Sequence, residues 1–273
     1  DRANEVARLK RFCMKKILFI VCLMFSCMLH AQTKQADVTR ATLYGVGFSN
    51  LLDTYLSPQE YTGIDLRLSR ESIRKSRWEN ITQQTFFQSN LSFTHNQIEN
   101  NNTIGMLANW NYALHYNFPI TENFKLLAGG LADLNGGFTY NMRNGNNPVQ
   151  ARIYANIGAT GMAVWNTKIK NYPISLRYQI NLPLMGVMFM PEYGQSYYEI
   201  FSLGNADGVV NFTSLHNQPA LRQMLTADFP VGKATMRFAY VWDAQQAKVN
   251  DIKVHNYSHT FMIGFVKHFN IVK

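Results

Sequence analysis

The feature of this sequence that most restricts its fold is a series of long segments in which apolar and polar residues alternate. Residues 103–118 show the pattern best. Successive side chains along a β-strand point to opposite faces of the sheet, so this alternation predicts a strand with one apolar face. That face would carry Ile104, Met106, Ala108, Trp110, Tyr112, Leu114, Tyr116 and Phe118. The other would carry Thr103, Gly105, Asn109, Asn111, His115 and Asn117, with Leu107 and Ala113 as apolar exceptions.

The same alternation returns in residues 172–184, 234–243 and 260–270. Strands of soluble sandwiches usually have about five or six residues, whereas a transmembrane strand needs about 9–11. These segments reach or exceed the longer figure, with aromatic residues on one face and Asn, Arg and Gly on the other. An apolar exterior around a polar interior is typical of a β-barrel that spans a lipid bilayer.

The sequence therefore predicts an antiparallel transmembrane β-barrel of about ten strands, with one long extracellular loop at residues 187–218. Strand boundaries taken from sequence carry an error of about two to four residues, so eight or twelve strands remain open alternatives. An even number of strands places both ends of the chain on the periplasmic side. The expected strands are 37–50, 61–72, 80–96, 103–118, 123–140, 150–166, 172–186, 219–230, 233–247 and 254–270.

The beginning of the chain resembles a secretory signal peptide. Residues 14–31 read MKKILFIVCLMFSCMLHA, with two lysines, a short apolar run and a small residue at a cleavage point. The apolar run has about 13 residues and a membrane-spanning helix needs about 20. We expect residues 1–31 to be an upstream extension and a removed leader, and residues 32–273 to be one outer-membrane barrel domain. A buried helix of a cytoplasmic protein, or a lipoprotein modified at Cys27, remain open alternatives.

Cysteine and charge restrict the chemistry of the exported part. All three cysteines (Cys13, Cys22 and Cys27) precede the expected cleavage site, which leaves no disulfide and no cysteine metal site. Of 26 Lys and Arg, six lie in residues 1–31, as do two of 17 Asp and Glu. The +9 charge of the whole chain therefore overstates that of the exported part, and nucleic acid is not an expected partner. The one basic cluster, residues 70–77, is predicted to be a turn that is solvated or lies beside anionic lipid or polysaccharide.

Several charged residues fall on the polar faces that would point into the barrel. A barrel of about ten strands is narrow, so these side chains should fill its lumen. They could form paired charges that fix strand register, or a selective path for a small anion. Arg177, Arg237 and Asp243 are the lumen candidates for binding. The complete inward set is Asp65, Arg67, Arg152, Arg177, Arg222, Asp228, Arg237 and Asp243.

Catalytic candidates are confined to polar loops. Ser214 and His216, followed by Asn217, could form a serine–histidine arrangement in which the histidine removes the hydroxyl proton. Loop-capping hydrogen bonds are the alternative for the same residues. His255 and His259 would lie roughly 13 Å apart on a strand, which argues against a shared metal ion. We expect no metal and no cofactor. Loop residues Tyr193, Tyr197 and Tyr198 are candidates for ligand contact or for a cap over the barrel mouth.

The sequence also resembles a known family. The segments PEYGQSYYEIF (191–201), SLHNQP (214–219) and DFP (228–230) are similar to the uncharacterised Bacteroidetes outer-membrane family called domain of unknown function 3316. The resemblance covers most of residues 32–273. It implies an outer-membrane location and no particular activity. The chain ends FNIVK, without the terminal aromatic residue that the barrel-insertion machinery usually recognises.

We therefore carry three hypotheses from different functional classes. We expect a structural or binding barrel without catalytic activity; a narrow channel or transporter for a small solute and a lipid or lipopolysaccharide hydrolase are the alternatives. The expected partners are outer-membrane lipid, the barrel-insertion machinery and a small-molecule or polysaccharide ligand.

Overall fold

The computed structural model describes residues 37–145, 147–170, 172–232 and 234–270. The expected upstream extension and signal peptide, with all three cysteines, lie outside these residues. No helix in the part of the chain that the structure describes is both long and apolar enough to cross a membrane.

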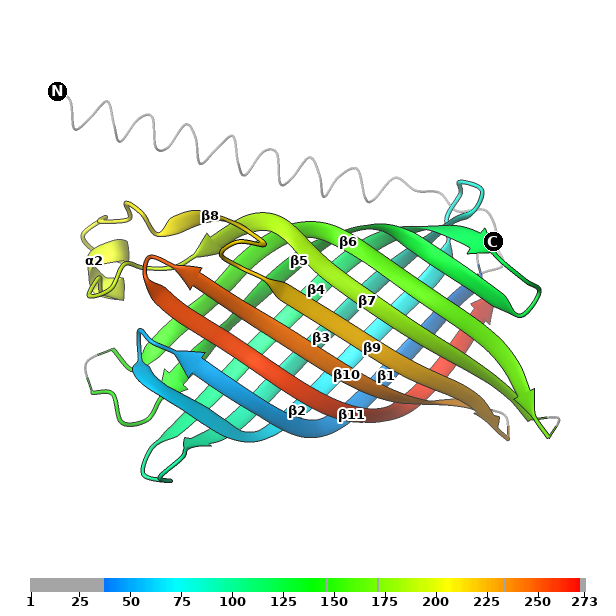
Figure 1. Ribbon diagram of the computed structural model, residues 1–273, viewed down its shortest axis with the longest axis horizontal. Helices are drawn as coiled ribbons and strands as arrows, with labels where there is room; N and C mark the ends of the chain where they lie inside the picture. The colour runs from blue at the N-terminus through cyan, green and yellow to red at the C-terminus, as the bar shows by residue number, and fades with distance from the viewer. Residues whose placement is uncertain (1–36, 146, 171, 233, 271–273) are drawn as a thin grey trace. The chain divides into compact units, whose positions relative to one another are not determined.

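The described residues form eleven strands and one short helix (Figure 1). The first six strands are β1 (Asp37–Asp53), β2 (Ser57–Lys75), β3 (Ile81–Asn96), β4 (Asn102–Pro119), β5 (Phe124–Asn141) and β6 (Val149–Ile169). The rest of the chain forms β7 (Tyr172–Phe189), α2 (Tyr197–Phe201), β8 (Val210–Ser214), β9 (Ala220–Val231), β10 (Ala234–Val249) and β11 (Ile252–Asn270).

All strand pairs are antiparallel, and the sheet closes into a barrel through pairing of β6 with β7 and of β1 with β11. The eleven strands occupy ten places around the barrel wall, because β8 and β9 lie along the same edge of β7 and together fill one place. Strand β9 pairs with β7 at Ser175–Asn181, and β8 continues the same edge of β7 at Met185–Phe189. This closed antiparallel barrel confirms the prediction of about ten strands. Closure pairs the first and last strands of the wall with each other, which removes the two long open edges that an open sheet would have.

The two ends of the barrel differ. Strand β1 begins and β11 ends at one end, called here the terminal end, together with the short β2–β3, β4–β5, β6–β7 and β9–β10 turns. The opposite end, called the cap end, carries α2 and β8 (Figure 1). Its longest connection is the segment between β7 and β9, and its other connections are shorter.

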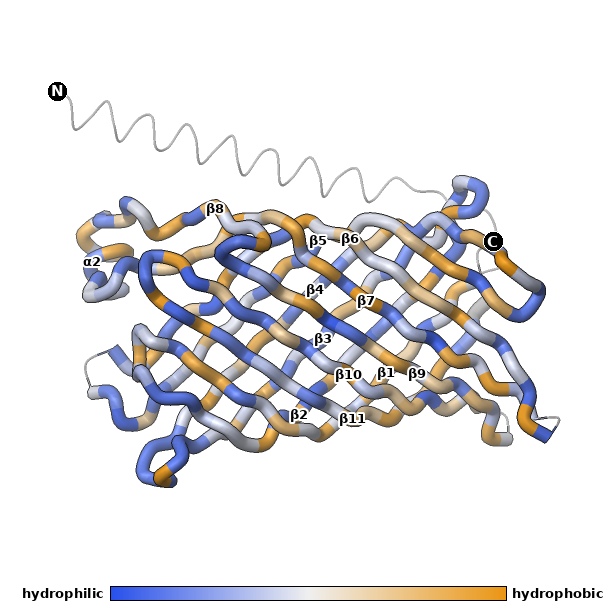
Figure 2. The backbone as a smooth tube through the Cα atoms, in the orientation of Figure 1, coloured by the Kyte–Doolittle hydropathy of each residue, from blue (hydrophilic) through white to orange (hydrophobic). Residues whose placement is uncertain are grey.

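Polarity alternates from residue to residue along the strands, as Figure 2 shows by colour. Phe48 is 72% exposed on the outer wall, whereas Asp65 is fully buried in the lumen. The segment expected to show this best, β4, points Trp110 outward and buries Asn109 and Asn111 inside. Hydrophobic side chains thus cover the outside of the barrel, whereas its inside holds many buried polar side chains together with two buried apolar clusters.

The seam between β1 and β11 depends on glycine. A Cβ atom on Gly47 would collide with the backbone of His259, and one on Gly264 would collide with the backbone at Thr42. Both glycines lie on the lumen side, where the strands approach closely. The absence of a side chain therefore permits the tight coiling that closes a narrow barrel.

Three details differ from the sequence prediction. Strand β2 extends to Lys75, so most of the basic cluster at residues 70–77 is strand and not turn. The loop expected at 187–218 contains the end of β7, the helix α2 and strand β8. A bulge opposite Ile157 and Gly158 leaves Leu184 without a register partner, so the inward positions of β7 shift by one residue beyond it. Periodicity breaks at such a bulge and no longer indicates the face.

Tyr178 tests the assignment of outward faces. Its side chain lies on the outer wall of β7 and donates a hydrogen bond to Gln223 Oε1 at 2.7 Å. Replacing Tyr178 by Arg near the middle of the bilayer should lower the free energy of unfolding by about 2–4 kcal/mol. Tyr178→Phe, which removes only the hydroxyl, should cost about 1 kcal/mol or less. Reversible urea unfolding in lipid vesicles measures both, and equal costs would contradict the outward assignment.

Candidate functional site

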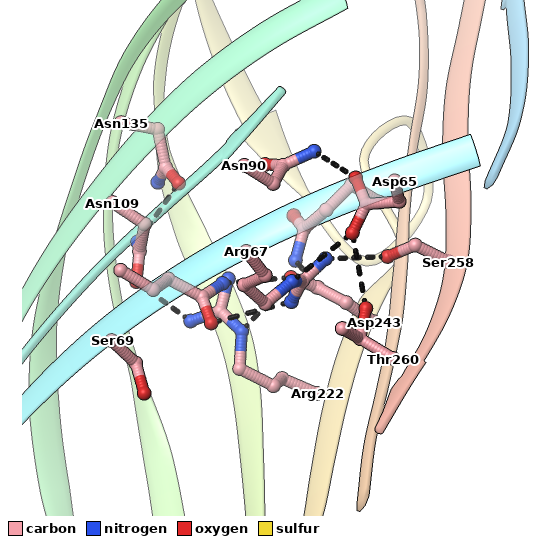
Figure 3. A network of polar contacts seen from close by, with 12 residues as sticks. Asp65, Arg67, Ser69, Asn90, Asn109, Asn135, Arg222, Asp243, Ser258 and Thr260 are labelled. Atoms are coloured by element: carbon pink, nitrogen blue, oxygen red, sulfur yellow. Dashed lines mark hydrogen bonds and ion pairs between the residues drawn. The ribbon is translucent and has the colours of Figure 1, made fainter. Parts of the chain in front are cut away.

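The centre of the lumen holds a cluster of buried charges around Arg67 (Figure 3). The Arg67 guanidinium contacts Asp65 Oδ2 at 3.4 Å and Asp243 Oδ2 at 3.3 Å. It also donates to Ser258 Oγ at 2.6 Å. Asp65 and Arg67 are two residues apart on β2, so their side chains point to the same face of the strand. A planar guanidinium with five donors can make several such contacts at once.

Asp243 extends this cluster across to other strands. Its carboxylate accepts hydrogen bonds from Arg222 Nε at 3.1 Å, Gln88 Nε2 at 2.9 Å and Gln245 Nε2 at 2.6 Å. Arg222 in turn donates to Asn109 Oδ1 on β4 at 2.8 Å. A single carboxylate thus joins arginines from β2 and β9. Buried charges need this degree of pairing, because an unpaired charge inside a protein is strongly unfavourable.

A second cluster surrounds Glu71, closer to the terminal end. Arg177 contacts Glu71 Oε1 at 2.9 Å, and Arg237 contacts Glu71 Oε2. Arg237 also pairs with Asp228. Strands β2 and β7 are five positions apart in the ten-position wall, so they face each other across the lumen. The Glu71–Arg177 pair therefore spans the full width of the barrel.

A pair of amide side chains beside the Glu71–Arg177 pair also joins two walls across the lumen. Gln84 on β3 and Gln179 on β7 exchange two hydrogen bonds, at 3.0 and 2.9 Å. Gln84 also donates to Glu71 at 2.6 Å. Both glutamines are almost completely buried. A solute that moved along the axis would have to break these contacts, of which the Gln84–Glu71 hydrogen bond is charge-assisted.

The cap end of the lumen is closed by apolar side chains. Met190 and Ile252 are completely buried there, and Tyr55 packs against the same cluster. The buried members are Leu107, Tyr154, Met188, Met190, Ala247, Val249, Ile252 and Val254.

The segment between β7 and β8 is bound to the barrel rim by hydrogen bonds. The Tyr55 hydroxyl donates to the Gln195 carbonyl oxygen at 2.8 Å. The Tyr197 hydroxyl donates to Gln150 Oε1 at 2.8 Å and accepts from the Ala151 N–H at 2.6 Å. Helix α2 begins with a capping box, in which Ser196 and Glu199 satisfy each other's backbone N–H groups. This segment is a structured cap.

The three loop tyrosines have different surroundings. Tyr197 is anchored on the rim, and burial raises its pKa to about 12. Burial also raises the pKa of Tyr55, as do the nearby Asp53 and Glu199 carboxylates. Tyr193 and Tyr198 are 76% and 66% exposed. Of the three tyrosines, Tyr193 and Tyr198 are therefore the two whose side chains are open to a molecule outside the barrel.

Ser214 and His216 do lie together, at the end of β8. Ser214 Oγ and His216 Nδ1 are 2.5 Å apart at the exposed surface. Asn217, however, accepts a hydrogen bond from the Ser214 N–H through its Oδ1 atom and donates one from Nδ2 to the Phe212 carbonyl oxygen. These bonds stabilise the turn and do not orient the histidine. Within the described ranges no third group is positioned to complete a catalytic triad around His216. The arrangement fits a turn more closely than a nucleophile.

The other histidine candidates lie apart on the outer wall. His255 Nε2 contacts Asn50 Oδ1 at 3.0 Å, and His259 Nδ1 contacts the Tyr240 hydroxyl at 2.6 Å. Among the residues that the structure describes, no three His, Cys, Asp or Glu side chains are grouped as metal ligands would be.

The terminal end contains a cavity of about 1010 Å³. Its lining includes Asp228, whose partner Arg237 belongs to the second charge cluster. The lining residues are Asn123, Trp165, Asn166, Thr167, Lys168, Pro173, Ile174, Ser175, Asp228, Phe229, Pro230, Thr235 and His268.

Comparison with known proteins identifies the family. A family model described as "Protein of unknown function (DUF3316)" matches residues 16–273. The chain belongs to this family. The resemblance noted in the sequence is thereby confirmed at the level of the family, and the description of DUF3316 gives no activity. No protein with a curated description matches the sequence.

Solved structures with similar architecture are distant from this DUF3316 member. The outer membrane protease OmpT from Escherichia coli matches 87% of this chain and 98% of its own, with 7% identity and a TM-score of 0.41. The translocator domain of the autotransporter NalP from Neisseria meningitidis matches 94% and 97%, with 10% identity and a TM-score of 0.34. A Pseudomonas aeruginosa FadL homologue matches 88% and 69%, with 9% identity and a TM-score of 0.36.

The structure places all eight charged candidates on the lumen side, but one partner was missed. Arg177 pairs with Glu71, which is not among the inward residues predicted from the sequence. Glu71 lies within the basic cluster that was interpreted as a turn. Glu71 is separated from Asp65 and Arg67 by an even number of residues along β2, so it lies on the same face of the strand as they do. This spacing is the signal that would have placed Glu71 inside the barrel.

Alkaline pH should release the cap. When the cap is bound to the rim, burial favours the neutral Tyr197 hydroxyl over the phenolate. The contribution of this residue to the stability of the bound cap is therefore complete below its ordinary pKa near 10 and is lost as pH rises through about 12. Tyr197→Phe should speed proteolysis of residues 190–209 at neutral pH and make its pH dependence shallower. The exposed Tyr193→Phe is the matched control and should change neither. A cap that is cut at the same rate at pH 8 and pH 12 would contradict this.

Proposed function

We propose that this chain is an outer-membrane β-barrel that acts as a closed structural or binding protein, without conduction and without catalysis. The observation that carries the proposal is the Glu71–Arg177 ion pair, which joins opposite walls of the lumen. A polar path through the barrel would need this pair to separate, and each separated charge would be costly in so enclosed a space.

The membrane location is supported by the outer surface. Side chains such as Phe48, Phe261 and Phe265 are each more than half exposed. An apolar exterior of this extent would be unfavourable in water and is favourable against lipid. Residues 1–31 would supply the export signal, and the barrel-insertion machinery would assemble the strands. The terminal end would then face the periplasm and the cap end the outside of the cell.

Binding of a ligand or polysaccharide outside the cell would use the cap. Tyr193 and Tyr198 present aromatic rings and hydroxyl groups to solvent while Tyr197 holds the segment on the rim. Tyrosine suits such a surface because it offers a large rigid contact area and a hydrogen-bonding group. The Ser214–His216 pair would serve the fold of the adjacent turn.

Planar bilayer recordings test the closed lumen. The purified barrel should give no regular single-channel steps, because opposite walls are bridged and the cap end is filled by apolar side chains. Removing three of the bridging arginines together (Arg177→Ser, Arg222→Ser and Arg237→Ser) leaves the apolar filling of the cap end in place, so a variant that inserts should still give no regular steps. Regular steps from the native protein would support the narrow-channel alternative and contradict the proposal.

A further inference from the structure

We propose that a cleft in the barrel wall at the terminal end, between the β6–β7 and β9–β10 hairpins, binds the phosphate headgroup of a phospholipid from the periplasmic leaflet. This inference rests on the proposed membrane location. The cleft is the cavity of about 1010 Å³ at this end of the barrel, and residues of both hairpins line it.

The cleft begins where two neighbouring strands stop pairing. The β7–β9 ladder ends at Ser175 and Asp228. Toward the terminal end β7 continues to Tyr172 and β9 to Val231, and the pairs that the structure describes for these last residues are with β6 and β10 only. The two hairpins, which lie next to each other at this end (Figure 1), are therefore not joined by a ladder there.

Proline on both sides favours this opening. Pro173 of β7 and Pro230 of β9 both line the cavity. A proline has no backbone N–H, so neither residue can donate a hydrogen bond across the gap. Proline within sheets is found at strand ends, edges and bulges for the same reason. Both strands that border the cleft are thus poorly suited to extend the ladder.

The cavity joins the lumen side of the wall to its outer side. Ser175 is two residues from Arg177 on β7 and shares its inward face, and Asp228 of β9 points inward to its ion pair in the second charge cluster. The next residues along the chain, Ile174 and Phe229, therefore have outward positions. All of these except Arg177 line the same cavity, so the cleft passes through the wall.

Strand register places the cleft at the edge of the apolar belt. Phe229 is opposite Met236 on β10, and Met236 is opposite Phe265 on β11. Phe265 is followed at the next outward position by Lys267. Trp165, which also lines the cleft, is of the type enriched at membrane interfaces. The cleft is therefore at the height of lipid headgroups.

The polar lining favours an anionic group. Asp228 is the one acid among the described lining residues, and Arg237 compensates its charge with two hydrogen bonds at 2.5 and 2.6 Å. Lys168 lines the same cavity, is exposed and has no ion-pair partner within the described ranges. Asn166 and Thr235 add an amide and a hydroxyl donor. Phosphate oxygens accept such hydrogen bonds, and the Lys168 ammonium would balance their charge.

A phospholipid combines the features that this cleft requires. Its phosphate would lie beside Lys168, and its acyl chains would continue over Ile174 and Phe229 onto the outer wall. A free anion would leave the apolar side of the cleft uncovered, and an uncharged lipid would leave Lys168 without a partner. Ligand pockets commonly measure about 300–1,000 Å³, so this cavity can hold a complete headgroup.

Native mass spectrometry tests the cleft on barrels extracted from vesicles of phosphatidylglycerol that contain a minor fraction of diacylglycerol with the same acyl chains. Relative to its share of the vesicle, the native protein should retain phosphatidylglycerol in preference to diacylglycerol, which lacks the phosphate. Lys168→Gln should retain phosphatidylglycerol about fivefold less, as expected for the loss of one cation at the membrane surface. Lys168→Arg should keep the preference, which separates loss of charge from loss of folding.

Two pairs of variants test the place of binding. Lys170→Gln removes the same charge from the same hairpin but does not alter the described lining, so retention should be unchanged. Thr235→Trp fills the cavity without changing its charge and should lower retention to a similar extent as Lys168→Gln. Thr42→Trp, on the outer face of β1, is its control and should have no effect. Equal loss from Lys168→Gln and Lys170→Gln, or full retention by Thr235→Trp, would contradict binding in the cleft.

Three further results would overturn the inference. Retention of the two lipids in proportion to their share of the vesicle would show that the phosphate is not recognised. Displacement of phosphatidylglycerol by millimolar inorganic phosphate would indicate a site for the free anion. Failure of the protein to float with vesicles would contradict the membrane location and this site together, whereas flotation without preference for the phospholipid would contradict this site alone.

Discussion

The constraint on which this structure depends is that backbone N–H and C=O groups find no partners in hydrocarbon. A sheet that crosses lipid must therefore close on itself, and ten strands close around a narrow lumen. The polar face of each strand then has to be satisfied by other side chains in a confined space. The Glu71–Arg177 and Arg67–Asp243 pairs meet this requirement by joining strands across the barrel. The charged interior follows from closure and from the alternation of each strand.

All five arginines of the buried ion pairs share one property that lysine lacks. A guanidinium donates in several directions in one plane, so Arg67 and Arg237 each contact two carboxylates. Such a contact can hold two or three strands in register at once. The network thus links the chemistry of single residues to the closure of the wall, and the apolar filling near Met190 closes the cap end in a different way.

Most of the wall could be predicted from sequence because the alternation of a strand is a local property. The ten wall strands were each predicted, with boundaries within four residues of those observed. The lumen partners could not be predicted, since a residue on β2 finds its partner on β7 only after the barrel has closed. Glu71 is the example: its basic neighbours suggested a turn. The cap was predicted only as a loop, because α2 and β8 are each five residues long.

A double-mutant cycle on Glu71 and Arg177 tests the central claim most directly. The free energy of unfolding in lipid vesicles would be measured for Glu71→Gln, Arg177→Gln and the double variant. A pair that bridges the lumen predicts a coupling energy of roughly 1–3 kcal/mol. The same cycle with Glu71 and Arg222, which are not paired with each other, should be nearly additive. Additive effects for Glu71 and Arg177 would contradict a lumen closed by ion pairs between opposite walls.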